Sequence, residues 1–116
     1  MDTVIKNGHV LDIKNGIDKT TDIGISGRYI VEIGDLSAVP CRETIDASGC
    51  YVVPGLIDFH AHAFYGISDF SMPADLALIP HGVTAMVDAG SAGTSNFEGF
   101  YRDVVCRSIL TIKSFI

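Results

Sequence analysis

The sequence predicts a chain of the α/β class, in which a β-rich N-terminal module is followed by βαβ units. Two observations support this prediction. Up to about residue 53, short β-type runs are broken by turn residues, whereas after Pro54 and Gly55 apolar strands alternate with helical periodicity. Alternation of strands and helices is typical of a parallel sheet. We therefore divide the chain into residues 1–54 and 55–116.

The N-terminal module consists of short strands and turns. Residues 3–6 and 9–12 flank Asn7-Gly8, a strong hairpin signal. Further β-type runs cover 22–26, 29–33, 44–47 and 51–53, with turn residues at 14–16 and 27–28. This pattern predicts a small antiparallel sheet, or one part of a β-sandwich.

Three strands and two helices are predicted after residue 54. The run 56–61 is almost continuously apolar, which is typical of a strand buried on both faces. The helices are expected over 73–79, with Ser71 as a cap, and over 96–107, capped by Asn96. The other strands cover 82–90 and 108–116. Three parallel strands leave an open edge, which a homo-oligomer would cover.

Composition excludes some classes of partner. The 116 residues carry 8 Lys and Arg against 14 Asp and Glu, a formal net charge of −6, and no basic cluster, so nucleic acid is not an expected partner. No apolar run is long enough to span a membrane. The N-terminus lacks the pattern of a signal peptide, so we expect a cytoplasmic protein. The cysteines Cys41, Cys50 and Cys106 lack C-x-x-C spacing and are expected to be buried thiols.

The strongest chemical signal is the H-x-H pair formed by His60 and His62. Side chains two apart on a strand share a face, and their Cα atoms are about 6.6 Å apart. Two imidazoles in this arrangement can bind one metal ion. We therefore predict that His60 and His62 are metal ligands.

Other polar residues near this pair allow two interpretations each. Asp58 lies on the same face as His60 and is either a third ligand or, more in keeping with its depth, a hydrogen-bonding support. Asp88, at the end of the second strand, is either a ligand or an anchor for the following loop. His81 precedes that strand and His9 lies in the N-terminal module, so neither is predicted to be a ligand.

The segment 90–93 contains a serine between glycines. It matches neither a phosphate-binding P-loop nor a serine nucleophile elbow, which require other glycine spacings. We therefore interpret Gly90-Ser91-Ala92-Gly93 as a flexible loop that lines the metal pocket.

These motifs together resemble the N-terminal part of the amidohydrolase superfamily. The resemblance rests on Gly8-His9-Val10, on Ile45-Asp46-Ala47-Ser48-Gly49, on the run from Val53 through Pro54-Gly55 to His60-Ala61-His62, and on the segment from Gly82-Val83-Thr84 to Gly93. Within the superfamily, the last segment is most similar to the dihydroorotase-like group of amidohydrolases and deacetylases. The resemblance implies a (β/α)8, or TIM, barrel flanked by a β-sandwich, of which residues 55–116 would be about the first three βα units.

The resemblance also implies an activity. It suggests that His60 and His62 bind a divalent metal, commonly zinc, in a hydrolase of amide or ester bonds in small acylated molecules. The further ligands and the proton-transferring aspartate of this superfamily have no counterpart in this sequence, so we assign no catalytic residue and expect an inactive N-terminal fragment. Phe64 stands where dihydroorotases carry a substrate-binding arginine, which favours deacetylase chemistry. The alternative is a non-catalytic binding or assembly module with a vestigial metal motif.

Overall fold

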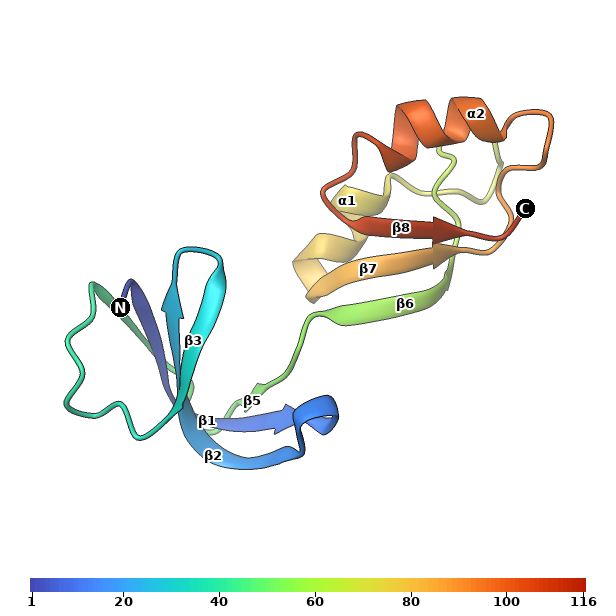
Figure 1. The fold of residues 1–116 in the computed structure, drawn as a ribbon. Helices are drawn as coiled ribbons and strands as arrows, with labels where there is room; N and C mark the ends of the chain where they lie inside the picture. The colour runs from blue at the N-terminus through green and yellow to red at the C-terminus, as the bar shows by residue number, and fades with distance from the viewer. The chain divides into compact units, whose positions relative to one another are not determined.

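The computed structural model describes residues 1–116 and shows a mixed α/β chain (Figure 1). The chain forms two compact units, Met1–Pro54 and Gly55–Ile116, which are described separately. None of its helices has the length and apolar character that crossing a membrane requires.

The first unit contains one five-stranded sheet. Its strands are β1 (Thr3–Asp12), β2 (Ile17–Ser26), β3 (Tyr29–Gly34), β4 (Glu43–Asp46) and β5 (Tyr51–Val52). The order is β3-β2-β1-β4, and β5 also pairs with β1. Strands β1, β2 and β3 are antiparallel as predicted, but β4 and β5 lie parallel to β1. The prediction of an antiparallel sheet is therefore wrong for β4 and β5, because residues 35–42 return the chain to the far side of β1.

The predicted hairpin at Asn7-Gly8 is also wrong, since β1 runs through both residues. The pairing of β1 with β2 shifts register between Ile5 and Gly8, so the dipeptide forms a β-bulge. Asn7 has a φ of 61° and its backbone N–H donates to Asp22 Oδ1 at 2.9 Å. A Cβ on Gly8 would overlap the side chain of Val52, so the strands approach closely at this point. The dipeptide forms a bulge and not a hairpin turn, because Asn7 is hydrogen-bonded to β2 and Gly8 lies against β5.

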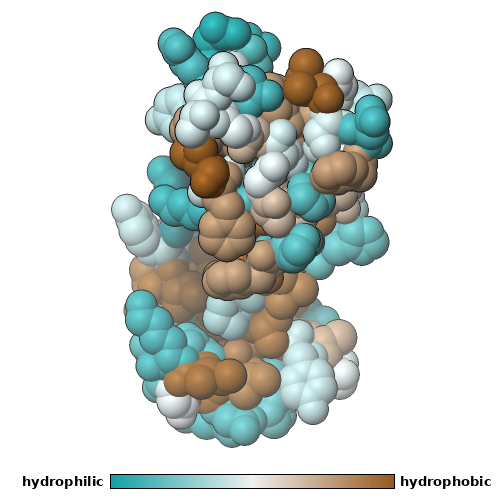
Figure 2. All heavy atoms as spheres, turned by 90° about the vertical axis from the view of Figure 1, so that its right-hand side faces the viewer, coloured by the Kyte–Doolittle hydropathy of each residue, from teal (hydrophilic) through white to brown (hydrophobic).

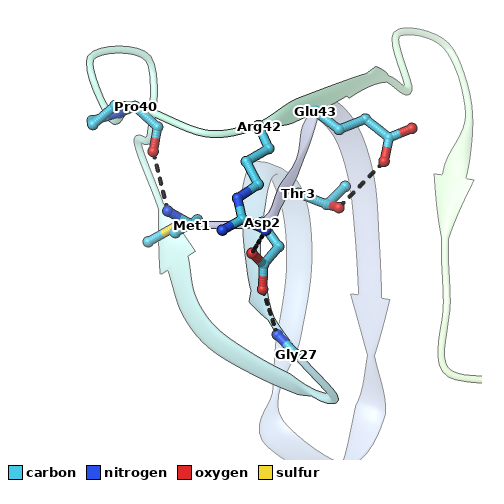
Figure 3. Close-up of polar contacts among 7 residues, drawn as sticks. All are labelled: Met1, Asp2, Thr3, Gly27, Pro40, Arg42 and Glu43. Carbon is cyan, nitrogen blue, oxygen red and sulfur yellow. Dashed lines mark hydrogen bonds and ion pairs between the residues drawn. The ribbon is translucent and has the colours of Figure 1, made fainter.

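Polar contacts hold the N-terminal residues of this unit (Figure 3). The Met1 ammonium donates to the carbonyl of Pro40 at 3.1 Å. The Asp2 carboxylate accepts from Gly27 N at 2.7 Å and pairs with Arg42 at 3.6 Å. The start of β1 is thereby tied to the β2–β3 turn and to the segment that precedes β4.

The second unit contains a parallel sheet in the order β6-β7-β8. Its elements are β6 (Leu56–Ala61), α1 (Ala74–Leu78), a 3-10 turn (Ile79–His81), β7 (Val83–Asp88), α2 (Phe97–Phe100) with a π-helical continuation (Tyr101–Val105), and β8 (Thr111–Ser114). The predicted alternation of strands and helices is confirmed. The predicted side-chain caps are not, because Ser71 Oγ donates to Ser91 Oγ and Asn96 Oδ1 accepts from Gly93 N instead.

The core of the second unit lies between the sheet and its helices. Its largest fully buried side chains include Phe100 and Met86. Along β6, however, Leu56, Ile57 and Phe59 are 50%, 58% and 70% exposed. The prediction of burial on both faces is therefore wrong, because β6 is an edge strand in this chain. Apolar side chains also reach the surface in Figure 2.

The three cysteines are free. The prediction that they are buried is wrong, because Cys50 and Cys106 are exposed and Cys41 is half-buried.

Candidate metal-binding site

The two predicted ligands lie where β6 ends. His60 is the second-last residue of β6 and is exposed, while His62 follows the strand and is half-buried. Parallel strands of α/β proteins commonly present their functional side chains at this carboxyl end. The pair thus occupies a position at which such proteins bind ligands.

The imidazoles of His60 and His62 lie close together in an edge-to-face arrangement. Their ring centroids are 5.5 Å apart, with an interplanar angle of 74°. Two imidazoles that share one zinc ion at Zn–N distances of about 2.0–2.1 Å and tetrahedral angles have ring centres about 5 Å apart. The observed separation therefore fits two ligands of one metal ion.

His62 is held by two further contacts. Its ring packs edge-on against Phe70, with centroids 4.7 Å apart. Its Nδ1 is hydrogen-bonded to Ser91 Oγ at 3.1 Å, and Ser71 Oγ donates to Ser91 Oγ at 3.3 Å. These contacts leave Nε2 as the ring nitrogen available to a metal.

The sequence does not predict the hydrogen bond between Ser91 and His62. The prediction that its loop lines the metal pocket does not identify the contact, since no spacing rule joins residues that are 29 positions apart. Gly90, which precedes the serine and lies two residues after the end of β7, has a φ of 90°, a backbone conformation that glycine adopts readily.

Asp88 anchors this loop. The residue is fully buried, and its carboxylate accepts from the backbone N–H groups of Ala63 at 2.7 Å, Gly90 at 3.1 Å and Ser91 at 2.6 Å. Of the two interpretations offered for Asp88, the structure favours the anchor, because backbone donors surround the carboxylate.

Asp58 supports the backbone of the pair. Its Oδ1 accepts from His60 N at 3.0 Å, next to a register shift between β6 and β7. The carboxylate thereby accepts from the backbone of His60 at an irregular part of the strand.

The remaining histidines lie outside this cluster. His81 ends the 3-10 turn before β7, at the opposite end of the strand from Asp88. His9 is in β1, where its Nε2 contacts Asp18 Oδ1 at 2.7 Å. In residues 1–116 no three His, Cys, Asp or Glu side chains gather in a group able to hold a metal. The candidate site is thus a pair of histidines with two carboxylates and a serine that bond to the same segments.

Phe64 is a core residue. It is 8% exposed and packs against Phe100 with ring centroids 5.2 Å apart. The position thus contributes to folding of the unit and presents no polar group to a substrate.

Comparison with known proteins gives consistent results. Residues 43–100 match the Amidohydrolase family. A deacetylase of Agrobacterium fabrum is 37% identical over 105 residues, which are 89% of this chain and 26% of that protein. The chain thus spans about a quarter of the length of this relative.

Solved structures show the same relationship. A dihydroorotase crystal structure superposes with a TM-score of 0.79 at 30% identity, covering 98% of this chain and 30% of that chain. The N-acyl-D-glutamate deacylase of Bordetella bronchiseptica, solved with zinc and a phosphonate inhibitor, gives a TM-score of 0.60 at 32% identity. The superposed region covers 76% of this chain and 18% of the deacylase chain.

Proposed function

Because this chain belongs to the amidohydrolase family, we propose that His60 and His62 are ligands of a divalent metal, with zinc as the expected ion. The observation that carries the proposal is the 5.5 Å separation of their ring centroids at the end of β6. The zinc in the related N-acyl-D-glutamate deacylase structure supports the choice of ion.

The proposed activity of the whole protein is hydrolysis of an amide or ester bond in a small acylated molecule. A bound divalent metal would activate water and polarise the carbonyl group of such a substrate. In this proposal β6, β7 and β8 are the first strands of a (β/α)8 barrel, and residues 1–54 are part of a β-sandwich. The strand order β6-β7-β8 with intervening helices supports this assignment.

Phe64 argues against a substrate whose carboxylate is bound at this position. A phenylalanine side chain carries no charge and this one is buried against Phe100, so the position offers no cation to a carboxylate substrate. The similarity to a deacetylase agrees with acyl-group removal. We therefore place deacylation ahead of dihydroorotase chemistry.

The chain alone is proposed to bind metal without turnover. A catalytic zinc site uses about three protein ligands and an open position. This structure brings together two histidines, and the Asp88 carboxylate is occupied by three backbone donors.

Zinc binding tests the proposal. Purified wild-type chain, the double variant His60→Ala/His62→Ala and the control His81→Ala would be loaded with zinc, desalted and analysed for bound metal. The wild type and the control should retain the same amount, and the double variant should retain less. Equal zinc in all three proteins would refute the assignment of the pair as ligands.

An assembly module is the second candidate, and the exposed apolar side chains of β6 favour it. In this proposal a second copy of the chain covers β6, and the histidines are vestigial. Light scattering distinguishes the two ideas: a defined dimer whose mass is unchanged in the double histidine variant supports assembly, whereas a monodisperse monomer argues against it.

A further inference from the structure

We propose that Ser91 is a positioning residue that selects the metal-binding tautomer of His62. This inference rests on the proposed function, because it assumes that His62 Nε2 is the ligand atom. The carrying observation is the 3.1 Å hydrogen bond between Ser91 Oγ and His62 Nδ1.

The chemistry of imidazole explains why this contact matters. A neutral imidazole carries one N–H, and only the other ring nitrogen has a lone pair available to a metal. When Nδ1 carries the hydrogen and donates it to Ser91 Oγ, Nε2 has its lone pair free. Partners of this kind hold metal-binding histidines in one tautomer and one ring orientation.

The hydroxyl of Ser91 is able to act as that acceptor. A serine oxygen has two acceptor sites. One is used by the Ser71 hydroxyl, which donates at 3.3 Å, and the second is left for His62 Nδ1–H. Ser71 thereby helps to fix the rotamer of Ser91.

The backbone places Ser91 independently of its hydroxyl. Ser91 N donates to Asp88 Oδ1 at 2.6 Å, and Asp88 Oδ2 accepts from Ala63 N at 2.7 Å, directly after His62. One fully buried carboxylate thus joins the serine loop to the histidine segment. Replacing the hydroxyl leaves both backbone contacts in place, so Ser91→Ala isolates its effect.

The ring of His62 is also restrained by Phe70. Phe70 packs edge-on against it with centroids 4.7 Å apart, so rotation of the ring away from Ser91 would break this contact. Loss of the Ser91 hydroxyl should consequently change the tautomer more than the ring position.

The first test measures the tautomer in metal-free protein. Imidazole nitrogen chemical shifts of His62 would be recorded by NMR at mildly alkaline pH, so that the two neutral tautomers are compared. We expect the Nδ1–H form to dominate in the wild type and in Ser91→Thr, which keeps the hydroxyl. In Ser91→Ala the Nε2–H form should gain population, and Ser71→Ala should give a smaller change.

The second test titrates the same proteins with zinc. Loss of a supporting partner of a metal-binding histidine typically weakens metal affinity by about 10–100-fold. We expect a loss of about 10-fold in Ser91→Ala, with recovery in Ser91→Thr. Unchanged backbone amide shifts of Ala63 and Gly90 would show that the Asp88 contacts remain.

The two tests separate failure of this inference from failure of the proposed function. A dominant Nε2–H form in the wild type, or identical tautomers in the wild type and Ser91→Ala, would overturn the role of Ser91. Absence of zinc binding in the wild type, together with the expected tautomers, would refute the metal assignment and leave the hydrogen-bonding role of Ser91 supported.

Discussion

Single carboxylates hold irregular backbone in both units. Asp22, which is 9% exposed, accepts from Asn7 N at 2.9 Å and Leu36 N at 3.1 Å, and so supports the bulge of β1. In the second unit, Asp88 accepts from Ala63 N and Ser91 N and so holds the loop after β7. The sequence offers the anchor role for Asp88 as one of two alternatives, but gives no sign of the role of Asp22, because its partners are set by strand pairing.

Asp46 provides a pH-dependent prediction. Hydrogen bonds from the Ser48 hydroxyl at 2.6 Å, from Ser48 N at 3.0 Å and from the Asn7 side chain at 3.3 Å favour its charged form. They hold the pKa of Asp46 below its ordinary value of 3.8. Because the folded pKa is lowered, the stabilisation is present above the unfolded pKa and is lost as pH falls through the folded pKa.

Ser48→Ala should therefore raise the pKa of Asp46. NMR titration of the carboxyl carbons would measure the change. Asp35 is the control, because its own pKa is lowered mainly by Ser37 and should not move. An unchanged Asp46 pKa in Ser48→Ala would show that the Ser48 hydroxyl is not the cause of the lowered value.

Gly8→Ala should destabilise the first unit. The added Cβ would overlap Val52 Cγ2 and lie 3.1 Å from Ala47 Cβ, so neighbouring strands would have to move. Overpacking of this kind typically costs about 1–3 kcal/mol. Urea unfolding would measure the loss, with Gly34→Ala as the control because a Cβ there meets nothing within 4 Å. A smaller loss in Gly8→Ala than in the control would contradict the close approach.

At the scale of elements, the ends of β6 and β7 assemble the site. Ala89 N donates to Ala61 O at 2.9 Å, and Met72 N donates to His62 O at 2.9 Å. These contacts fix the backbone at Ala61, between the two histidines, and at His62 itself. The strands themselves are predictable from their apolar runs, but the contacts between their ends depend on the register of β6 against β7.

Asp88→Ala should destabilise the second unit. Removal of the carboxylate leaves the buried N–H group of Ala63 and the partly buried N–H groups of Gly90 and Ser91 without their acceptor. Hydrogen bonds to charged groups contribute about 1.5–3 kcal/mol each, so we expect a loss of about 3 kcal/mol or more. Urea unfolding and amide hydrogen exchange at Ala63 would measure it.

Asp88→Asn and Asp69→Ala are the matched variants for this prediction. The Asp88→Asn variant would retain one acceptor oxygen, so its loss of stability should be smaller than that of Asp88→Ala. Asp69 is exposed, and its substitution should change stability little. Equal stability of Asp88→Ala and Asp69→Ala would show that the carboxylate does not anchor the loop.

At the scale of the whole molecule, the chain exposes large apolar side chains in both units. Tyr29 on β3 is 73% exposed and Phe59 on β6 is 70% exposed. The 47% hydrophobic content of the sequence already indicates apolar surface of this kind. Exposed apolar strand edges are sites of association between chains.

Charged residues on β6 should reduce self-association. The double variant Ile57→Lys/Phe59→Lys removes exposed apolar surface from an edge strand and adds like charges. We expect a lower average mass by light scattering and less binding of an apolar dye. Leu76→Lys is the control, since Leu76 is 78% exposed on α1 and not on a strand. An equal effect of this control would contradict a specific role for β6.

The sequence by itself determined the class of each main element, the H-x-H pair and the family resemblance, because these depend on local periodicity and on residues adjacent in the chain. Only the tertiary structure decided that Asn7 and Gly8 form a bulge, that β4 and β5 lie parallel to β1, and that Ser91 contacts His62. The physical reason is that strand direction, register and side-chain partners are set by packing between residues far apart in the sequence. The sequence supplied the two histidines and two alternative roles for Asp58 and for Asp88, and the fold selected the supporting roles and added the contact with Ser91.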